Sequence, residues 1–251
     1  YGGHPAATVG TKVYVGDLHG RVWRFSTADP GTLSTITADM MYDFGVQQPI
    51  AHPVALLYYS TRDGDALKPH IYVETGDDRR LATPPEGFLL AGLRDEEDAL
   101  ANPLATLLFS FPLLERFRGT AQPATALVLR EPDEDRWLGR VIFVATRYNP
   151  VNADCVSSFD SRVYIVGAGT GEAAFDLDQS GNVDSADTYY DFTGQLVKAV
   201  QVAFGRLVVD KGLGADEPPP PPAPASGQTV APEIHLLRLT DYNPVGSSVC
   251  R

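Results

Sequence analysis

The chain has 251 residues, of which 43% are hydrophobic, and its 32 acidic and 20 basic side chains give a formal net charge of −12. This composition can fill a sizeable core. So acidic a surface argues against nucleic-acid binding and favours divalent cations, unless the charge serves solubility alone. No apolar run reaches the length that spans a membrane. Because the chain begins at Tyr1 without Met, we expect a fragment or a processed product, and we treat residues 1–251 as one domain.

The first predicted element is a β-hairpin over residues 11–26, TKVYVGDLHGRVWRFS. Apolar residues alternate on both sides of the sequence Asp-Leu-His-Gly at 17–20, which has the composition of a tight turn. Similar short runs of β-branched and aromatic residues recur at residues 69–77, 139–146, 161–171, 205–210 and 233–240. Repetition of a strand-turn-strand unit predicts a mainly β protein with the blades of a full or partial β-propeller, and an antiparallel sandwich is the alternative.

Two segments interrupt this pattern. Residues 86–118 combine leucines with charged residues in a spacing that predicts one or two helices, whose length Pro103 and Pro112 limit. Residues 216–227, DEPPPPPAPASG, predict a polyproline II segment. We expect a solvated spacer between two strands there, and a ligand for an aromatic groove is the alternative.

A cation-binding motif stands out at residues 176–187, DLDQSGNVDSAD, where oxygen-bearing side chains occupy alternate positions. Calcium requires six to eight oxygen ligands, and a tightly curled loop with this spacing collects them. Gly181 stands at the sixth position, where the turn requires a positive φ, and we expect Val183 at the eighth position to pack the loop onto the body. The predicted calcium ligands are Asp176, Asp178, Ser180, Asn182, Asp184 and Asp187.

The predicted ligands have different roles. We expect Asn182 to contribute its backbone carbonyl, Asp184 to act through a water, and Asp187 to close the loop in place of the usual bidentate Glu. A shorter carboxylate also closes the loops of dockerin modules, which this stretch resembles locally. The flanking residues are typical of strands, so the ion would fix a loop rather than open a pair of helices. A solvated acidic turn is the alternative.

No enzyme motif accompanies this loop. The sequence has no zinc-spaced His pair, nucleophile elbow, P-loop or Cys-x-x-Cys, and the glycines at 167 and 169 lack the third glycine of a dinucleotide site. We therefore predict that the chain is not an enzyme. Cys155 and Cys250 can form a disulfide if the compartment is oxidising, and their pairing stays open.

Three features together resemble the C-terminal β-propeller of the PilY family, large secreted proteins of type IV pili. Residues 14–25, YVGDLHGRVWRF, are similar to the family's blade signature AGDLxGNLWRFD, although His19 and Arg21 depart from it. Residues 155–176 resemble its segment in which a cysteine precedes a strand and a Thr-Gly turn, and the calcium loop follows. The leucine-rich insertion and the proline tract are not family hallmarks.

The resemblance implies quinoprotein-like blades and an extracellular location at the pilus tip or cell surface. It also implies adhesion to host or abiotic surfaces, assembly with minor pilins, and calcium-linked pilus extension and retraction. Two other functions remain as alternatives. A quinoprotein dehydrogenase would need regular tryptophan motifs, but the chain has only Trp23 and Trp137; a dockerin-like interaction module would need two tandem loops with helices, but one loop is present.

Overall fold

The structure is a computed structural model that describes most of the first 212 residues. The described ranges are 7–9, 12–27, 36–59, 67–76, 84, 86–96, 104–119, 124–130, 137–149, 158–177, 180–203 and 206–212. Asp178, the two cysteines, the proline-rich tract at 216–227 and the predicted strand at 233–240 lie outside them.

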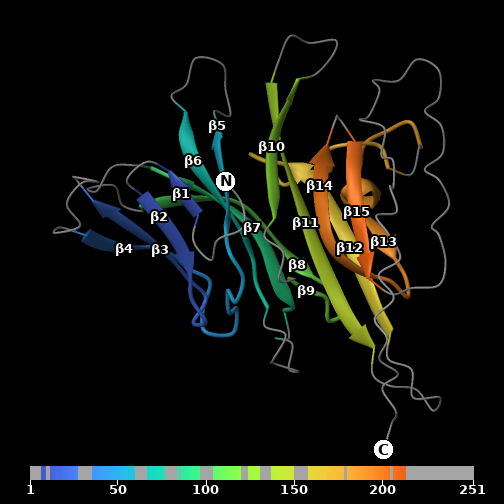
Figure 1. The fold of residues 1–251 in the computed structure, drawn as a ribbon, viewed down its shortest axis with the longest axis horizontal. Helices are drawn as coiled ribbons and strands as arrows, with labels where there is room; N and C mark the ends of the chain where they lie inside the picture. Colours follow the sequence, from blue (N-terminus) through green and yellow to red (C-terminus); the bar gives the residue numbers. More distant parts are fainter. Residues whose placement is uncertain are drawn as a thin grey trace, which may run out of the picture.

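The described strands form four antiparallel sheets that follow one another along the chain; the first three lie from left to right in Figure 1, and the fourth overlaps the third in this view. The first sheet contains β1 (Ala7–Val9), β2 (Lys12–Gly16), β3 (Arg21–Thr27) and β4 (Ile36–Asp43). The second contains β5 (Ala55–Tyr59), β6 (Lys68–Glu74), β7 (Phe88–Asp95) and β8 (Ala105–Leu113). The third contains β10 (Thr125–Arg130), β11 (Trp137–Asn149), β12 (Ser158–Gly167) and β13 (Tyr189–Phe192), with β9 (Arg118–Gly119) beside β11. The fourth contains β14 (Leu196–Ala203) and β15 (Arg206–Gly212).

Most predicted strands are present. The hairpin at 11–26 forms β2 and β3, and the runs at 69–77, 139–146, 161–171 and 205–210 overlap β6, β11, β12 and β15. The mainly β fold class is therefore confirmed. Apart from β9, which pairs with β11, strands adjacent in sequence are also neighbours within each of the first three sheets, and the described strands form open sheets rather than a closed ring or barrel.

The predicted helical insertion at 86–118 is wrong, because this segment forms β7, β8 and β9. Nearly every residue of β7 is buried, so its two faces are both apolar and the alternation typical of a half-exposed strand is absent. Gly92 confirms the tight strand packing, because a Cβ there would lie 2.5 Å from the ring of Phe109 on β8. Tertiary burial overrides the helix propensity of the leucines and alanines.

Consecutive sheets pack face to face, and the central strands contribute to two cores at once. Along β11, Val141, Phe143 and Ala145 point into the core shared with the second sheet. Ile142 and Val144 point into the core shared with the fourth sheet. Because successive side chains of a strand point to opposite faces, this division follows directly from the alternation of β11.

Backbone hydrogen bonds link separate sheets and fix the position of each sheet against the next. The connections that lead from one sheet to the next make these bonds close to the strand ends. The three bonds are Ile50 N to Asp17 O (2.9 Å), Gly76 N to Pro49 O (2.8 Å) and Gly119 N to Thr75 O (3.0 Å). They tie the first three sheets into one unit.

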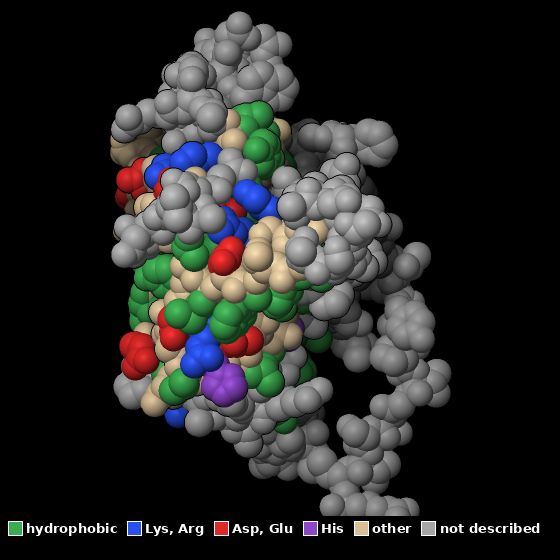
Figure 2. All heavy atoms as spheres, turned by 90° about the vertical axis from the view of Figure 1, so that its left-hand side faces the viewer, with side chains coloured by type: hydrophobic (Ala, Val, Ile, Leu, Met, Phe, Trp, Pro, Cys, Tyr) green, Lys and Arg blue, Asp and Glu red, His purple; other side chains and the backbone are tan. Residues whose placement is uncertain are grey.

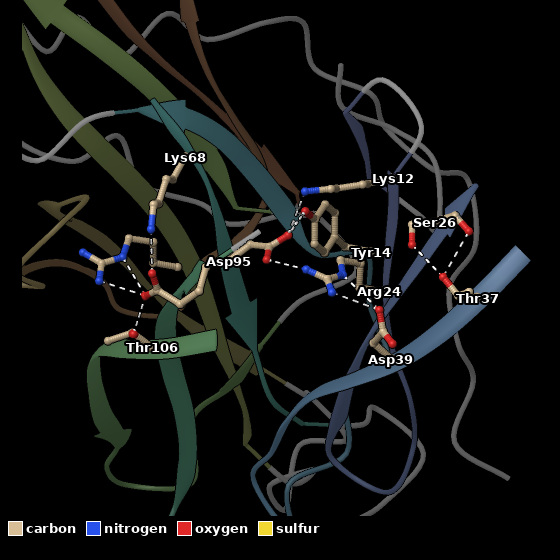
Figure 3. Close-up of polar contacts among 11 residues, drawn as sticks. Lys12, Tyr14, Arg24, Ser26, Thr37, Asp39, Lys68, Asp95 and Thr106 are labelled. Carbon is tan, nitrogen blue, oxygen red and sulfur yellow. Dashed lines mark hydrogen bonds and ion pairs between the residues drawn. The ribbon is translucent and has the colours of Figure 1, made fainter. Parts of the chain in front are cut away.

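A buried ionic network joins the first and second sheets (Figure 3). Asp95 on β7 is fully buried and lies 2.7 Å from Arg24 on β3, which is 2% exposed. Tyr14 donates a hydrogen bond of 2.5 Å to the same carboxylate, and the Lys12 ammonium lies 3.5 Å away. Arg24 also donates to Asp39 at 2.9 Å. The charge of Asp95 is thus compensated by groups from the neighbouring sheet.

A second polar cluster surrounds Glu96, next to Asp95. Partial burial alone would raise the pKa of Glu96, but hydrogen bonds from Lys68, Thr106 and Arg94 lower it from 4.5 to about 2. The folded state therefore holds this carboxylate in its charged form more strongly than the unfolded state does. The resulting stability is fully present above pH 4.5 and is lost as the pH falls towards 2.

Glu96→Gln tests this contribution. We expect the variant to lose on the order of 3 kcal/mol of unfolding free energy at pH 7, because it removes the favoured negative charge. We expect the difference from the unchanged protein to shrink steadily below pH 4.5, where both side chains become neutral. Urea unfolding at a series of pH values measures both effects. Asp43→Asn is the control, since Asp43 is a more exposed acid 3.6 Å from Arg21. If its unfolding free energy changed with pH as much as that of Glu96→Gln, the stability could not be assigned to the Glu96 cluster.

Candidate calcium-binding loop

The predicted calcium loop lies at the outer edge of the third sheet, between β12 and β13. The chain leaves β12 through a tight turn, in which Gly167 N donates to Glu172 O at 2.9 Å and Gly171 N donates to Gly167 O at 2.9 Å. This confirms the predicted turn at Gly167. The loop then ends in a short 3₁₀ helix, η1 (Ser185–Thr188), which leads directly into β13.

Asp176 organises the first half of the loop. Its carboxylate accepts hydrogen bonds from Ser180 N at 3.1 Å and from Gly181 N at 2.8 Å, so the chain curls around this side chain. Gly181 has a φ of 92°, which confirms the predicted left-handed conformation at the sixth position. Both features follow from the short-range spacing of the motif.

Asp187 closes the second half of the loop and is fully buried. It accepts from Leu177 N at 2.6 Å through one oxygen and from Asp184 N at 2.9 Å through the other. Asp184 in turn accepts from Ala186 N at 2.7 Å, and the side chains of Asp184 and Asp187 form a reciprocal capping box at the start of η1. The two ends of the motif are therefore linked through the Asp187 carboxylate, which accepts backbone hydrogen bonds from both.

Val183 does not have its predicted role. It is 54% exposed, so it does not pack the loop onto the body. Phe175, directly before the loop, takes this role: it packs against the core shared by the third and fourth sheets, and Arg140 lies 5.7 Å above its ring. The anchor therefore lies one position before the motif rather than inside it.

The donor set fits a hard cation in its chemistry, and the structure brings only part of it together. Ser180 donates to the Asn182 carbonyl at 3.1 Å, which places these two oxygens side by side. The described residues hold no group of three or more His, Cys, Asp or Glu side chains arranged around a common point. Asp176, Asp184 and Asp187 therefore do not converge, while Asp178, the remaining predicted carboxylate, lies outside the described residues. All these donors are oxygens, the atoms that calcium prefers.

The strand that follows the loop is held by an arginine between two rings. The Arg162 guanidinium lies 4.3 Å from the ring centre of Tyr189 on β13 and 4.2 Å from that of Phe117. Burial would lower the pKa of Arg162, but its ionic contacts raise it, with Asp191 at 2.8 Å as the strongest, and Glu115 lies 3.3 Å away. The loop is thus continuous with a well-anchored strand.

The sequence motif GDLHG has a structural explanation in the first sheet. Asp17 accepts hydrogen bonds from His19 N at 2.8 Å, Arg21 N at 3.0 Å and Trp23 Nε1 at 2.9 Å. Partial burial would raise the pKa of Asp17, but these hydrogen bonds lower it, so the carboxylate stays ionised. Gly20 has a φ of 82° and allows the turn to contact the next connection. The sequence predicted the turn but not the hydrogen bond from Trp23 to Asp17. The spacing of six residues between this Asp and the Trp was the available signal.

Comparison with protein-family models, with curated proteins and with solved structures finds no match to this chain. Among the residues described, no helix has the length and apolar character needed to cross a membrane.

Proposed function

We propose that this chain is a non-enzymatic, calcium-binding domain of a type IV pilus tip-associated protein, and that its sheets are blades of a full or partial β-propeller. In this proposal it acts at the cell surface, in adhesion to host or abiotic surfaces and in pilus assembly with minor pilins. The observation that carries the proposal is the loop at 176–187, with its oxygen donors and its closure by a buried carboxylate.

The chemistry of the donors supports calcium as the ligand, because every predicted ligand atom in the loop is an oxygen. The ligands in this proposal are Asp176, Asp178, Ser180, Asn182, Asp184 and Asp187. The cation would neutralise part of the local negative charge and hold the connection between β12 and β13 in one conformation.

The sheet architecture supports the second part of the proposal. Each of the first three sheets contains a meander of four consecutive strands, to which β9 is added in the third, and consecutive sheets pack face to face. Propeller blades have the same internal order. The turn fastened by Asp17 lies within the segment that resembles the blade signature of the PilY family, so the residues that carry the resemblance also have a structural role.

Asp178→Asn tests calcium binding. We expect calcium at about a hundredfold excess over its dissociation constant to stabilise the unchanged protein by about 2.7 kcal/mol, or roughly 5–10 °C in Tm. The variant should lose most of this shift, because it removes a ligand charge, and should melt like the unchanged protein in EGTA. Isothermal titration calorimetry and thermal melting, each with and without calcium, provide the measurements.

Glu172→Gln is the matched control, because Glu172 is an exposed acid close to the loop but outside the ligand set. It should keep the full calcium response. Equal melting curves of the unchanged protein in calcium and in EGTA, together with no heat of binding, would rule out calcium as a ligand.

The location and role of the domain need a test in cells. In bacteria that carry the gene, we expect antibodies against this chain to label pilus tips, and Asp178→Asn to reduce attachment in calcium-containing medium while Glu172→Gln does not. Label confined to the cytoplasm, or equal attachment of all variants, would contradict the pilus part of the proposal and leave calcium binding unaffected.

A further inference from the structure

The first sheet has an apolar face that points away from the rest of the molecule. The buried side chains in its strands are Tyr14, Val22, Arg24 and Met41, which face the second sheet. The alternate positions point the other way. We call their apolar members the outer face, and these are Val13, Val15, Trp23, Phe25, Ile36 and Met40.

The outer face is continuous across three strands. Val13 lies opposite Phe25, and Trp23 lies opposite both Val15 and Met40. Ile36 and Met40 are 54% and 47% exposed, and the other four side chains are half-buried. Figure 2 looks onto this side of the molecule and shows hydrophobic side chains gathered between scattered charged ones. Contiguous exposed apolar surface of this kind marks interaction sites.

The outer face contains the same kinds of residue as the sheet faces that pack against each other inside this chain. The core between the first and second sheets is built from Val22, Ile71, Val73 and similar side chains at alternate strand positions. A sheet face of β-branched and aromatic residues packs best on another such face, at about 10 Å separation. The chemistry of the outer face therefore fits a second β-sheet rather than a charged or polar ligand.

The charges on this side permit the approach of a second copy. Each chain has a net charge of −12, so two copies repel each other over most of their surfaces. The charged residues of β3 and β4 that share the outer side are Arg21 and Asp43, which have opposite signs and lie 3.6 Å apart. The described strands of the outer face therefore add no net charge to it, so their own charges do not oppose contact there.

We propose that the outer face joins two copies of this chain in a reversible, face-to-face dimer with Trp23 near its centre. The three strands that carry the outer face lie about 4.8 Å apart and are 5, 7 and 8 residues long, which gives a face of roughly 14 by 22 Å. That is less than half of the roughly 800 Å² per partner that a standard stable interface buries, which corresponds to a weak, concentration-dependent dimer.

Analytical ultracentrifugation of the full chain from about 1 to about 300 μM tests the dimer, because weak interfaces dissociate in this range. We expect a monomer at the low end and mostly dimer at the high end. Met40→Lys should weaken association at least tenfold, since it places a charge in the contact. Leu114→Lys is the matched control: Leu114 is 61% exposed but lies in the turn between β8 and β9, and this variant should associate like the unchanged protein.

Trp23 provides a second measurement that does not alter the outer face. In a Trp137→Phe background, Trp23 is the remaining tryptophan, and its quenching by acrylamide should decrease as the protein concentration rises. A chain that stays monomeric at all concentrations would overturn the proposal. In that case, a Trp23 shielded from acrylamide would indicate that the chain's own residues cover the outer face. An accessible Trp23 would indicate that the outer face binds a different partner. A dimer that Met40→Lys leaves intact would also overturn it, because another surface would hold the copies together.

Discussion

Arg24→Met is expected to destabilise the chain by about 3–5 kcal/mol, because it leaves the fully buried carboxylate of Asp95 without its closest positive charge. Methionine preserves most of the packing volume, so the loss reports the charge rather than a cavity. Tyr14 and Lys12 remain near the carboxylate, which favours the lower half of this range. Urea unfolding at pH 7 measures the effect.

Two further variants separate the buried charge from the rest of the network. Asp39→Asn removes the partly exposed partner of Arg24 and should cost no more than about 1 kcal/mol, as exposed ion pairs do. Combining Arg24→Met with Asp95→Asn should recover part of the loss, because the buried group is then neutral. An Arg24→Met variant within about 1 kcal/mol of the unchanged protein would contradict a stabilising role for this link between the sheets.

Gly20→Ala is expected to cost roughly 3–5 kcal/mol from two separate effects. A φ of 82° is unfavourable for alanine by about 1–2 kcal/mol. In addition, a Cβ at this position would lie 2.2 Å from the Gly45 carbonyl oxygen and 2.8 Å from that of Gln48, so the backbone must move. Thermal and urea unfolding measure the loss, and a change in Trp23 emission should accompany it because the turn positions Asp17.

Gly45→Ala is a control for the conformational part alone. Gly45 has a φ of 93°, but a Cβ there would meet nothing within 4 Å. This variant should lose only about 1–2 kcal/mol. Equal losses for the two variants would show that the close contact between the two connections contributes nothing to stability.

The strands that could be predicted from sequence are those whose signals are local. The hairpin of β2 and β3 has alternating apolar residues around a glycine-containing turn, and β12 has a short run of β-branched and aromatic residues that ends at a glycine. β7 could not be predicted in this way, because a strand covered on both faces shows a continuous apolar run that also suits a helix. The stacking of the sheets decides this case, and it depends on contacts between distant segments.

The same difference between local and long-range signals applies to the candidate site. The left-handed conformation of Gly181 follows from its place in the motif and was predicted, but the backbone hydrogen bonds that Asp176 accepts were not. The exposure of Val183 was not, because the neighbouring Phe175 supplies the anchor instead. The pairing of Arg24 with Asp95, across 71 positions, leaves no local signal in the sequence. Where the fold brings together groups that are distant in the chain, a single sequence offers little guidance.

Strands such as β11, which contribute side chains to two cores, restrict where this chain can gain or lose residues. The side chains of β11 belong in turn to the core on one side and the core on the other. One residue inserted in the middle of β11 would send each side chain beyond it to the opposite side, so that Phe143 and Ile142 would exchange surroundings. Both cores would be damaged by a single event. Insertions and deletions in related chains should therefore be confined to the connections, while the strands vary by substitution alone.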